Sequence, residues 1–147
     1  MRRSLYAHEE NRLVFVAGHN IVIHSLDDGS QQFIAGSEHA TEINYITLSA
    51  SGHYVACCER TDHRAQVSIY SVMSRKKKRT LPEPGMENFN LVCKEFLSCD
   101  FSKTTEEQHL VTLSGEGDWC AILWQWPEQL KMLAKVDLNI VEPEDPS

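Results

Sequence analysis

The sequence of 147 residues contains no run of 18 or more consecutive apolar residues, the length that a membrane-spanning helix needs. Residues 1–10 start with basic residues but lack the apolar segment of a signal peptide. Positive charge is also scarce, because 14 Lys and Arg stand against 21 Asp and Glu, a net charge of −7. We therefore expect no membrane insertion and no secretion, and nucleic acid is not expected as a partner because its phosphates attract basic surfaces.

Cysteine is present but lacks the pattern of a disulfide framework or a metal site. The five cysteines are odd in number, and no two of them form a C-x-x-C pair. They lie within or beside predicted strands, where thiols are commonly buried. Buried, reduced cysteines of a cytosolic compartment are favoured over a disulfide or a metal site. The residues are Cys57, Cys58, Cys93, Cys99 and Cys120.

Signatures of catalysis are missing as well. There is no G-x-S-x-G elbow and no reactive-cysteine motif. Ser114 precedes Gly115-Glu116-Gly117, which is typical of a hairpin turn and is too short to cradle a phosphate. The seven histidines are scattered without metal-ligand spacing. The sequence predicts no catalytic residue, cofactor or metal, and thus no enzyme.

A short strand-like pattern, by contrast, occurs three times. It is centred on Ile23, Ile69 and Leu123, at spacings of 46 and 54 residues, and each copy follows an apolar strand and a polar turn. This spacing is typical of four-stranded propeller blades lengthened by loop insertions. Hydrophobic residues make up 41% of the chain, enough for a core. We expect an all-β fold, an incomplete propeller of about three blades, because closure needs roughly four to eight.

The boundaries of the three units follow from their turns. We expect units at 11–36, 43–81 and 91–138, after an N-terminal lead-in at 1–10 and before a disordered acidic, proline-containing tail at 139–147. The first unit lacks a strand unless Leu5–Ala7 supplies it. The segment Leu130–Val136 contains good helix formers, but its place after three strands favours a strand.

The order of strands and turns resembles that of WD-repeat blades. Among WD-repeat proteins, the sequence resembles more closely the N-terminal propeller of one ciliary family, the cilia- and flagella-associated protein 57 type. The resemblance implies a scaffold of the axoneme near inner dynein arms or the regulatory complex between doublets, located in the cytoplasm and cytoskeleton. The matching residues are Phe33–Glu38, Leu48–Ala56 with its Ser-x-Ser-Gly turn, Ile69–Ser71, Phe101-Ser102 and Leu123–Trp126.

The chain departs from the family pattern in two ways. It has no coiled-coil segment, and the blade pattern stops at Asn139, which an alternative isoform or a truncated paralogue would explain. The Trp-Asp dipeptides of WD repeats are replaced by Ser25-Leu26, Ser71-Val72 and Trp126-Pro127. The Asp-His-Ser/Thr-Trp hydrogen-bond network that braces such blades is therefore expected to be absent.

Two groups of residues are candidate contact sites. The basic segment Arg75, Lys76, Lys77, Lys78 and Arg79 is predicted to be a solvated connection before an outer strand, with a contact for an acidic partner such as tubulin, or a nuclear-import signal, as alternatives. The aromatic residues Tyr70, Trp124 and Trp126 are predicted to pack between blades rather than to form a binding platform.

These observations favour a non-catalytic interaction protein of the ciliary or flagellar axoneme. Two alternatives remain, a cytosolic WD-repeat adaptor in trafficking or ubiquitin-ligase complexes and an enzyme that uses the propeller channel. The blade faces beside Leu13–Phe15 and Trp124–Trp126 are expected to lack neighbours. Further blades of a longer chain or a second subunit would have to cover them, and other axonemal proteins are the expected partners.

Overall fold

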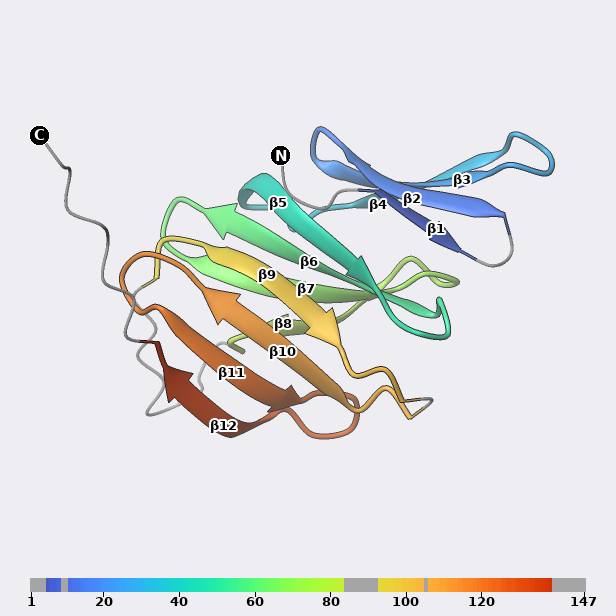
Figure 1. Ribbon diagram of the computed structural model, residues 1–147. Helices are drawn as coiled ribbons and strands as arrows, with labels where there is room; N and C mark the ends of the chain where they lie inside the picture. Colours follow the sequence, from blue (N-terminus) through green and yellow to red (C-terminus); the bar gives the residue numbers. More distant parts are fainter. Residues whose placement is uncertain (1–4, 9–10, 84–92, 105, 139–147) are drawn as a thin grey trace, which may run out of the picture.

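The computed structural model describes residues 5–8, 11–83, 93–104 and 106–138. These residues contain strands β1 to β12 and no α-helix. The strands form three antiparallel sheets of four strands each, and each sheet follows the chain order from one edge to the other. We call the sheets blade 1, blade 2 and blade 3 (Figure 1).

Blade 1 contains a first strand, Leu5–His8, in addition to the three strands that its sequence unit clearly predicts. It consists of β1 (Leu5–His8), β2 (Arg12–Ala17), β3 (Asn20–Ser25) and β4 (Gln31–Ala35). β1 pairs with β2, with Leu5 opposite Phe15 and His8 opposite Arg12. The assignment of residues 1–10 to a lead-in is therefore wrong for this strand, because the open possibility that Leu5–Ala7 completes the sheet is the one realised.

Blade 2 consists of β5 (Ala40–Leu48), β6 (Tyr54–Thr61), β7 (Ala65–Ser71) and β8 (Lys77–Leu81). The Ser49–Gly52 segment turns the chain as its sequence predicts. Gly52 N donates to the Ser49 carbonyl oxygen at 2.9 Å, and Gly52 has a φ of 79°, a conformation that favours glycine. The outer strand β8 begins within the basic segment that was expected to precede it.

Blade 3 consists of β9 (Phe96–Phe101), β10 (His109–Ser114), β11 (Cys120–Gln125) and β12 (Lys131–Asp137). β12 shows that the helix-forming residues after Leu130 adopt a strand, because β11 offers them a partner edge. The third unit was expected to start at residue 91, and its first strand begins at Phe96. Residues 84–92 and the expected tail at 139–147 lie outside the described residues.

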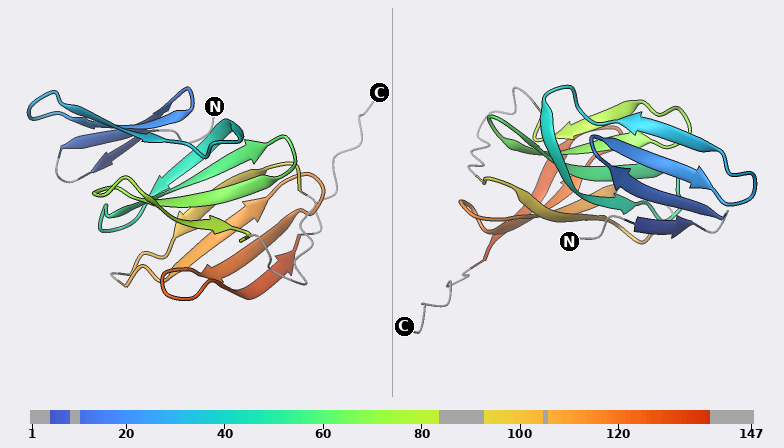
Figure 2. Two further views of the ribbon diagram at one scale, coloured as in Figure 1. Left: turned by 180° about the vertical axis from the view of Figure 1, so that it is seen from behind. Right: turned by 90° about the horizontal axis from the view of Figure 1, so that it is seen from above.

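The blades contact one another mainly through their first strands. β9 of blade 3 packs across β5, β6 and β7 of blade 2, and β5 of blade 2 contacts β1 and β2 of blade 1. Among the described strands, each sheet thus meets only its neighbour in sequence, and the three stand side by side like sectors of a ring (Figures 1 and 2).

Blade 2 is buried on both of its faces. One face, which includes Ile69 and Leu81, shares a core with blade 3, where Phe96, Leu110 and Trp124 are fully buried. The opposite face shares a second core with blade 1. Both faces of β7 carry buried side chains for this reason, since the successive residues Ile69 and Tyr70 point into different cores. The predicted all-β fold of three four-stranded propeller blades is confirmed.

Candidate interaction surfaces

The basic segment spans a turn and the beginning of an outer strand. Arg75 and Lys76 lie in the turn between β7 and β8, which is closed by a 2.9 Å bond from Ser71 N to the Lys76 carbonyl oxygen. The remaining three cations, Lys77–Arg79, belong to β8. The segment is therefore only partly the solvated connection that its sequence predicts, because β7 provides a partner for its second half.

Two of the five cations are engaged within the chain. Lys77 Nζ bonds to Ser37 Oγ and lies 5.8 Å from the centre of the Tyr70 ring. Arg79 Nε donates to the Trp126 carbonyl oxygen at 3.0 Å, and its guanidinium also bonds the Glu128 carbonyl oxygen at 3.0 Å. Arg79 thereby links the outer strand of blade 2 to the β11–β12 connection of blade 3.

The other three cations of the segment, Arg75, Lys76 and Lys78, are exposed. Within the described part of the chain, no ion pair involves their side chains. They form the basic surface of blade 2, the name that we use below for these three residues. An acidic partner could reach all of them without breaking a contact of the fold.

A buried carboxylate, which the sequence analysis missed, lies at the end of β6. Glu59 is fully buried and accepts hydrogen bonds from four donors, Ser37 N, Ser37 Oγ, Gln66 Nε2 and Ser68 Oγ. Both bonds from Ser37 measure 2.7 Å. Because Ser37 lies between β4 and β5, this network fastens the connection from blade 1 onto blade 2.

The sequence does contain one signal of this network, the pair Gly36-Ser37 after the fourth strand. A Cβ atom on Gly36 would lie 3.0 Å from the His19 carbonyl oxygen and 3.3 Å from Glu59 Oε2. The absence of a side chain at Gly36 therefore lets the connection approach the carboxylate. Glu59 itself follows four buried residues of a strand, which is an unusual place for an acid.

A cleft of about 440 Å³ opens next to this network. Ser37 and Gln66, which bond Glu59, form part of its wall, and His39, His63 and Arg64 contribute exposed rings and charge. Its side chains carry both signs of charge and come from two connections and the outer strand.

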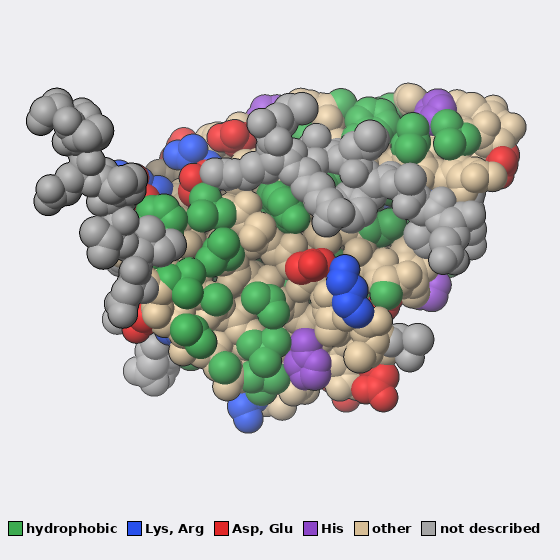
Figure 3. Space-filling view, in the orientation of Figure 1, with side chains coloured by type: hydrophobic (Ala, Val, Ile, Leu, Met, Phe, Trp, Pro, Cys, Tyr) green, Lys and Arg blue, Asp and Glu red, His purple; other side chains and the backbone are tan. Residues whose placement is uncertain are grey.

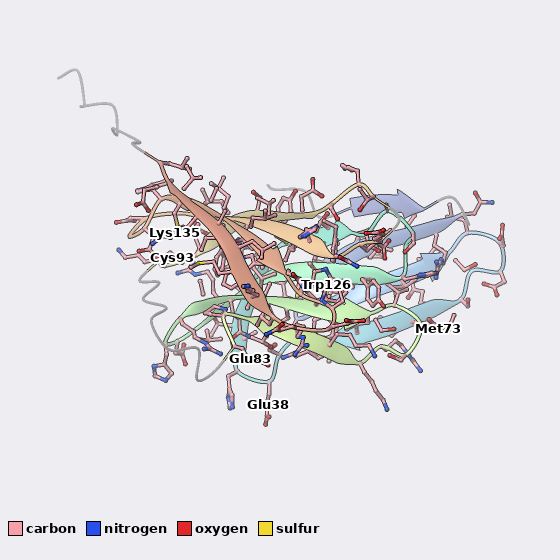
Figure 4. All side chains as sticks on the ribbon, turned by 90° about the horizontal axis from the view of Figure 1, so that it is seen from below. Glu38, Met73, Glu83, Cys93, Trp126 and Lys135 are labelled. Carbon is pink, nitrogen blue, oxygen red and sulfur yellow. The ribbon has the colours of Figure 1, made fainter. Side chains whose placement is uncertain are left out.

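The three aromatic residues lie between the blades. Tyr70 belongs to the core of blades 1 and 2, whereas Trp124 and Trp126 belong to the core of blades 2 and 3. Trp126 meets Tyr54 edge to face with ring centres 4.9 Å apart. Figure 4 places Trp126 between the ribbons of these two blades, while Met73 lies at the margin of the molecule.

Trp124 also makes a hydrogen bond that the sequence analysis did not expect. Its Nε1 donates to Thr112 Oγ1 at 3.0 Å in the buried core. One Trp-Thr bond of the kind found in WD repeats is thus present although the Trp-Asp dipeptides are absent. The expectation concerned the complete Asp-His-Ser/Thr-Trp network, and this bond supplies its Ser/Thr-Trp part in blade 3.

The open faces of the end blades carry Leu13 and Phe15, as expected, but not Val14, Trp124 or Trp126. Val14, Trp124 and Trp126 point into the cores, because successive residues of a strand alternate between its two faces. On blade 1 the open face carries Leu13, Phe15 and Phe33. On blade 3 it carries Leu113, Leu123, Val111 and Val136, of which the last two are exposed. Figure 3 shows hydrophobic side chains gathered over β9–β12.

The remaining candidates for chemistry have structural roles. Ser114 Oγ is buried and bonds both the backbone N and the carbonyl oxygen of Cys120. All five cysteines are buried with free thiols. Burial, reinforced by the negative charge of Asp118, raises the pKa of Cys93 to about 12. Burial likewise raises the pKa of Tyr70, whose hydroxyl lies near Ser37. Cys93 and Tyr70 therefore keep their protons at neutral pH.

The described residues offer neither a metal site nor a membrane-spanning helix. No group of three His, Cys, Asp or Glu residues there is arranged to hold a metal ion. The same part of the chain holds no helix with the length and apolar character to cross a membrane.

Two curated proteins are similar to this chain over most of its length. Cilia- and flagella-associated protein 57 C of Tetrahymena thermophila is 29% identical over 142 residues, which are 95% of this chain and 11% of that protein. Cilia- and flagella-associated protein 57 of Mus musculus is 26% identical over 132 residues, which are 88% of this chain and 10% of that protein. The chain thus spans about a tenth of the length of these relatives. No protein-family model matches it.

Solved structures share the fold. A WD40-type propeller chain in the crystal structure of the mitotic checkpoint complex matches with a TM-score of 0.70 at 15% identity, covering 93% of this chain and 37% of that one. A Bacteroides fragilis protein described as a candidate 6-phosphogluconolactonase matches with a TM-score of 0.62 at 12% identity, covering 90% and 38%. At such identities the likeness concerns the fold alone.

Proposed function

We propose that this chain, a relative of cilia- and flagella-associated protein 57 with three consecutive propeller blades, is a non-catalytic scaffold module of the ciliary or flagellar axoneme. The similarity to two proteins with that name over 88–95% of the chain carries the proposal. The antiparallel blades supply a rigid support, and their connections supply contact surfaces. Its location would be the cytoplasm and cytoskeleton, at the axoneme.

The residues that could perform chemistry support a binding role. Ser114 is held by the backbone of Cys120, and the Glu59 carboxylate is saturated by donors from its own chain. Hydrogen bonds of this kind stabilise the strands and connections of the blades. A scaffold that joins dynein-arm or regulatory-complex components needs this rigidity and no reaction.

The basic surface of blade 2 would contact an acidic partner, and tubulin is the one we favour. Arg75, Lys76 and Lys78 are exposed cations in a chain of net charge −7, so they concentrate the positive potential at one place. Their position at an outer edge leaves the blade faces available for other blades or a second subunit. A charged outer strand also discourages pairing with unrelated strands.

Microtubule co-sedimentation tests this contact. The variant K76E/K78E should bind microtubules several times more weakly, because charge reversal converts attraction into repulsion. The control variant K103E/K131E changes the net charge equally but at exposed lysines of blade 3. Equal binding by both variants would discard the tubulin contact.

Localisation of a tagged full-length product tests the axonemal role itself. Signal along cilia or flagella that survives detergent extraction of the membrane is the expected result. A diffuse cytosolic signal that is absent from cilia would reject the axonemal role and favour a cytosolic WD-repeat adaptor.

A further inference from the structure

On the face of each blade that is directed toward the next blade, one equivalent position is buried in blades 1 and 2 but exposed in blade 3. Ile34, Leu81 and Val136 occupy the same place on the outer strands, because each pairs with the residue two positions before Ile23, Ile69 or Leu123. Ile34 is 1% exposed beneath blade 2, and Leu81 is 0% exposed beneath blade 3. Val136 is 58% exposed. The face of blade 3 that faces away from blade 2 thus has the apolar character of a buried face.

On the opposite face of each blade, which is directed toward the preceding blade, the exposed position is in blade 1 and the buried ones are in blades 2 and 3. Leu26, Val72 and Trp126 each follow the third strand, and each donates its backbone N–H to the residue just before the second strand, Asn11, His53 and Gln108 respectively. Val72 is 3% exposed beneath blade 1, and Trp126 is 2% exposed beneath blade 2. Leu26 of blade 1, against which no other described blade packs, is 55% exposed.

The two exposed faces are therefore the two halves of one kind of interface, which the chain already forms twice. We propose that a second copy of this chain supplies the missing neighbours, so that blade 3 of each copy packs against blade 1 of the other. This proposal rests on the scaffold function above and names the second subunit that covers the open faces.

Ring geometry favours a pair of copies. The three described blades of one copy, joined head to tail with those of a second copy, make six blades, which falls within the roughly four to eight of closed propellers. Three copies would contain nine and exceed this range. A head-to-tail contact that closes leaves no face unpaired, whereas a contact between two like faces would leave the other pair exposed. The closed pair thus buries both apolar faces at once.

The internal interfaces indicate which residues would meet. Between blades 2 and 3, Tyr54 at the start of β6 contacts Trp126 edge to face. Between blades 1 and 2, Arg12 at the equivalent place lines a small cleft together with Val72. The equivalent of Tyr54 in blade 3 is His109, and the equivalent of Trp126 in blade 1 is Leu26. We therefore expect His109 of one copy to lie against Leu26 of the other.

Light scattering coupled to gel filtration tests the pairing on the 147-residue chain. The expected mass is twice the 16.8 kDa of one chain over a range of concentrations. A monomer at all concentrations would overturn the proposal. Because the axonemal role is scored by localisation and microtubule binding, its failure and that of the pairing are distinguishable.

Two surface substitutions test the arrangement of the faces. Leu26→Glu alters only the open face of blade 1, and Val136→Glu alters only that of blade 3, and both positions are exposed enough to spare the fold. Each variant alone should raise the dimer dissociation constant about tenfold or more, since each ring interface uses both faces. Mixing the two variants should restore one intact interface and produce heterodimers. Met73→Glu, at a position 89% exposed in the β7–β8 turn, is the control and should dimerise normally.

The dimerisation of these variants distinguishes head-to-tail pairing from a contact between two blade 3 faces. If Leu26→Glu still dimerises as well as the unaltered chain, the contact joins two blade 3 faces and the head-to-tail pairing is wrong. Failure of the mixed variants to associate would also overturn it. Circular dichroism of each variant verifies that the blades remain folded.

Discussion

Arg79 Nε, on the outer strand of blade 2, donates a hydrogen bond of 3.0 Å to the carbonyl oxygen of Trp126 in blade 3. The same guanidinium bonds the carbonyl oxygens of Pro127 and Glu128 at 3.3 and 3.0 Å. It also lies 3.6 Å from the Glu83 carboxylate. A residue that looks like one of five interchangeable surface cations is thus a brace between two blades.

Replacement of Arg79 by Gln should lower the free energy of unfolding by about 1–3 kcal/mol, because three backbone carbonyl groups lose a charged donor. Lys78→Gln, at the exposed neighbouring position, should change it by less than about 0.5 kcal/mol. Urea unfolding followed by circular dichroism measures both. Equal effects of the two changes would show that the brace adds nothing to stability.

Replacement of Glu59 by Ala should cost about 2–4 kcal/mol, because its buried hydrogen-bond donors lose their acceptor. Glu59→Gln keeps one acceptor oxygen and should cost less. Glu42→Ala is the matched control, because Glu42 is an exposed acid of the same blade that pairs with Arg60 at 3.6 Å. Urea midpoints rank the three variants. A Glu59→Ala protein as stable as the control would remove the network from the account of this fold.

The two tryptophans of blade 3 should respond differently to substitution by Phe. Trp124→Phe removes the indole donor of Thr112, whereas no acceptor among the described residues bonds Trp126 Nε1. We expect the unfolding free energy of Trp124→Phe to fall further than that of Trp126→Phe, by about 1 kcal/mol. The double variant Trp124→Phe/Thr112→Val should recover part of the loss, since no hydroxyl is then left unpaired. The ranking of thermal midpoints is the measurement.

Stability should decline in alkaline solution through Cys93. The thiol of an unfolded chain ionises near pH 9.0, whereas burial raises the pKa of folded Cys93 to about 12. Below pH 9.0 the thiol keeps its proton in the folded and the unfolded chain, so its contribution to folding stability is complete. Between pH 9 and 12 the unfolded chain ionises first, so stability is lost as the pH rises toward the folded pKa.

Cys93→Ala isolates this contribution from the other groups that titrate in the same range. Urea midpoints at pH 8 and at pH 10.5 should differ less for the variant than for the unaltered chain. Equal pH dependence in the two proteins would assign the alkaline decline to other residues.

The amino-acid pattern predicted most of the blades because alternation at period two is a local property. In β7, Ile69 and Tyr70 are both apolar, which correctly indicated a sheet covered on both sides. The strand Leu5–His8 was ambiguous because four residues are too few for alternation to stand out. Strand period also places Trp124 and Trp126 on one side without saying whether that side meets the preceding blade or solvent.

The polar contacts were harder to predict. Arg79 and Lys78 are adjacent cations, and only the position of blade 3 distinguishes the bonded one from the exposed one. Glu59 resembles a strand-end acid until Ser37, 22 residues earlier, is brought to it. Such long-range partners depend on the fold, so a single sequence gives little notice of them.

The double covering of blade 2 has a consequence for how the molecule opens. Each blade contacts only its sequence neighbours, so stability along the chain behaves as a row of units joined at their borders. In a single, unpaired copy, opening an end blade exposes one core, whereas opening the middle blade exposes two. At concentrations at which the chain is unpaired, the amide hydrogens of β6 and β7 should therefore exchange with solvent most slowly, and protection should fall outward toward β1 and β12.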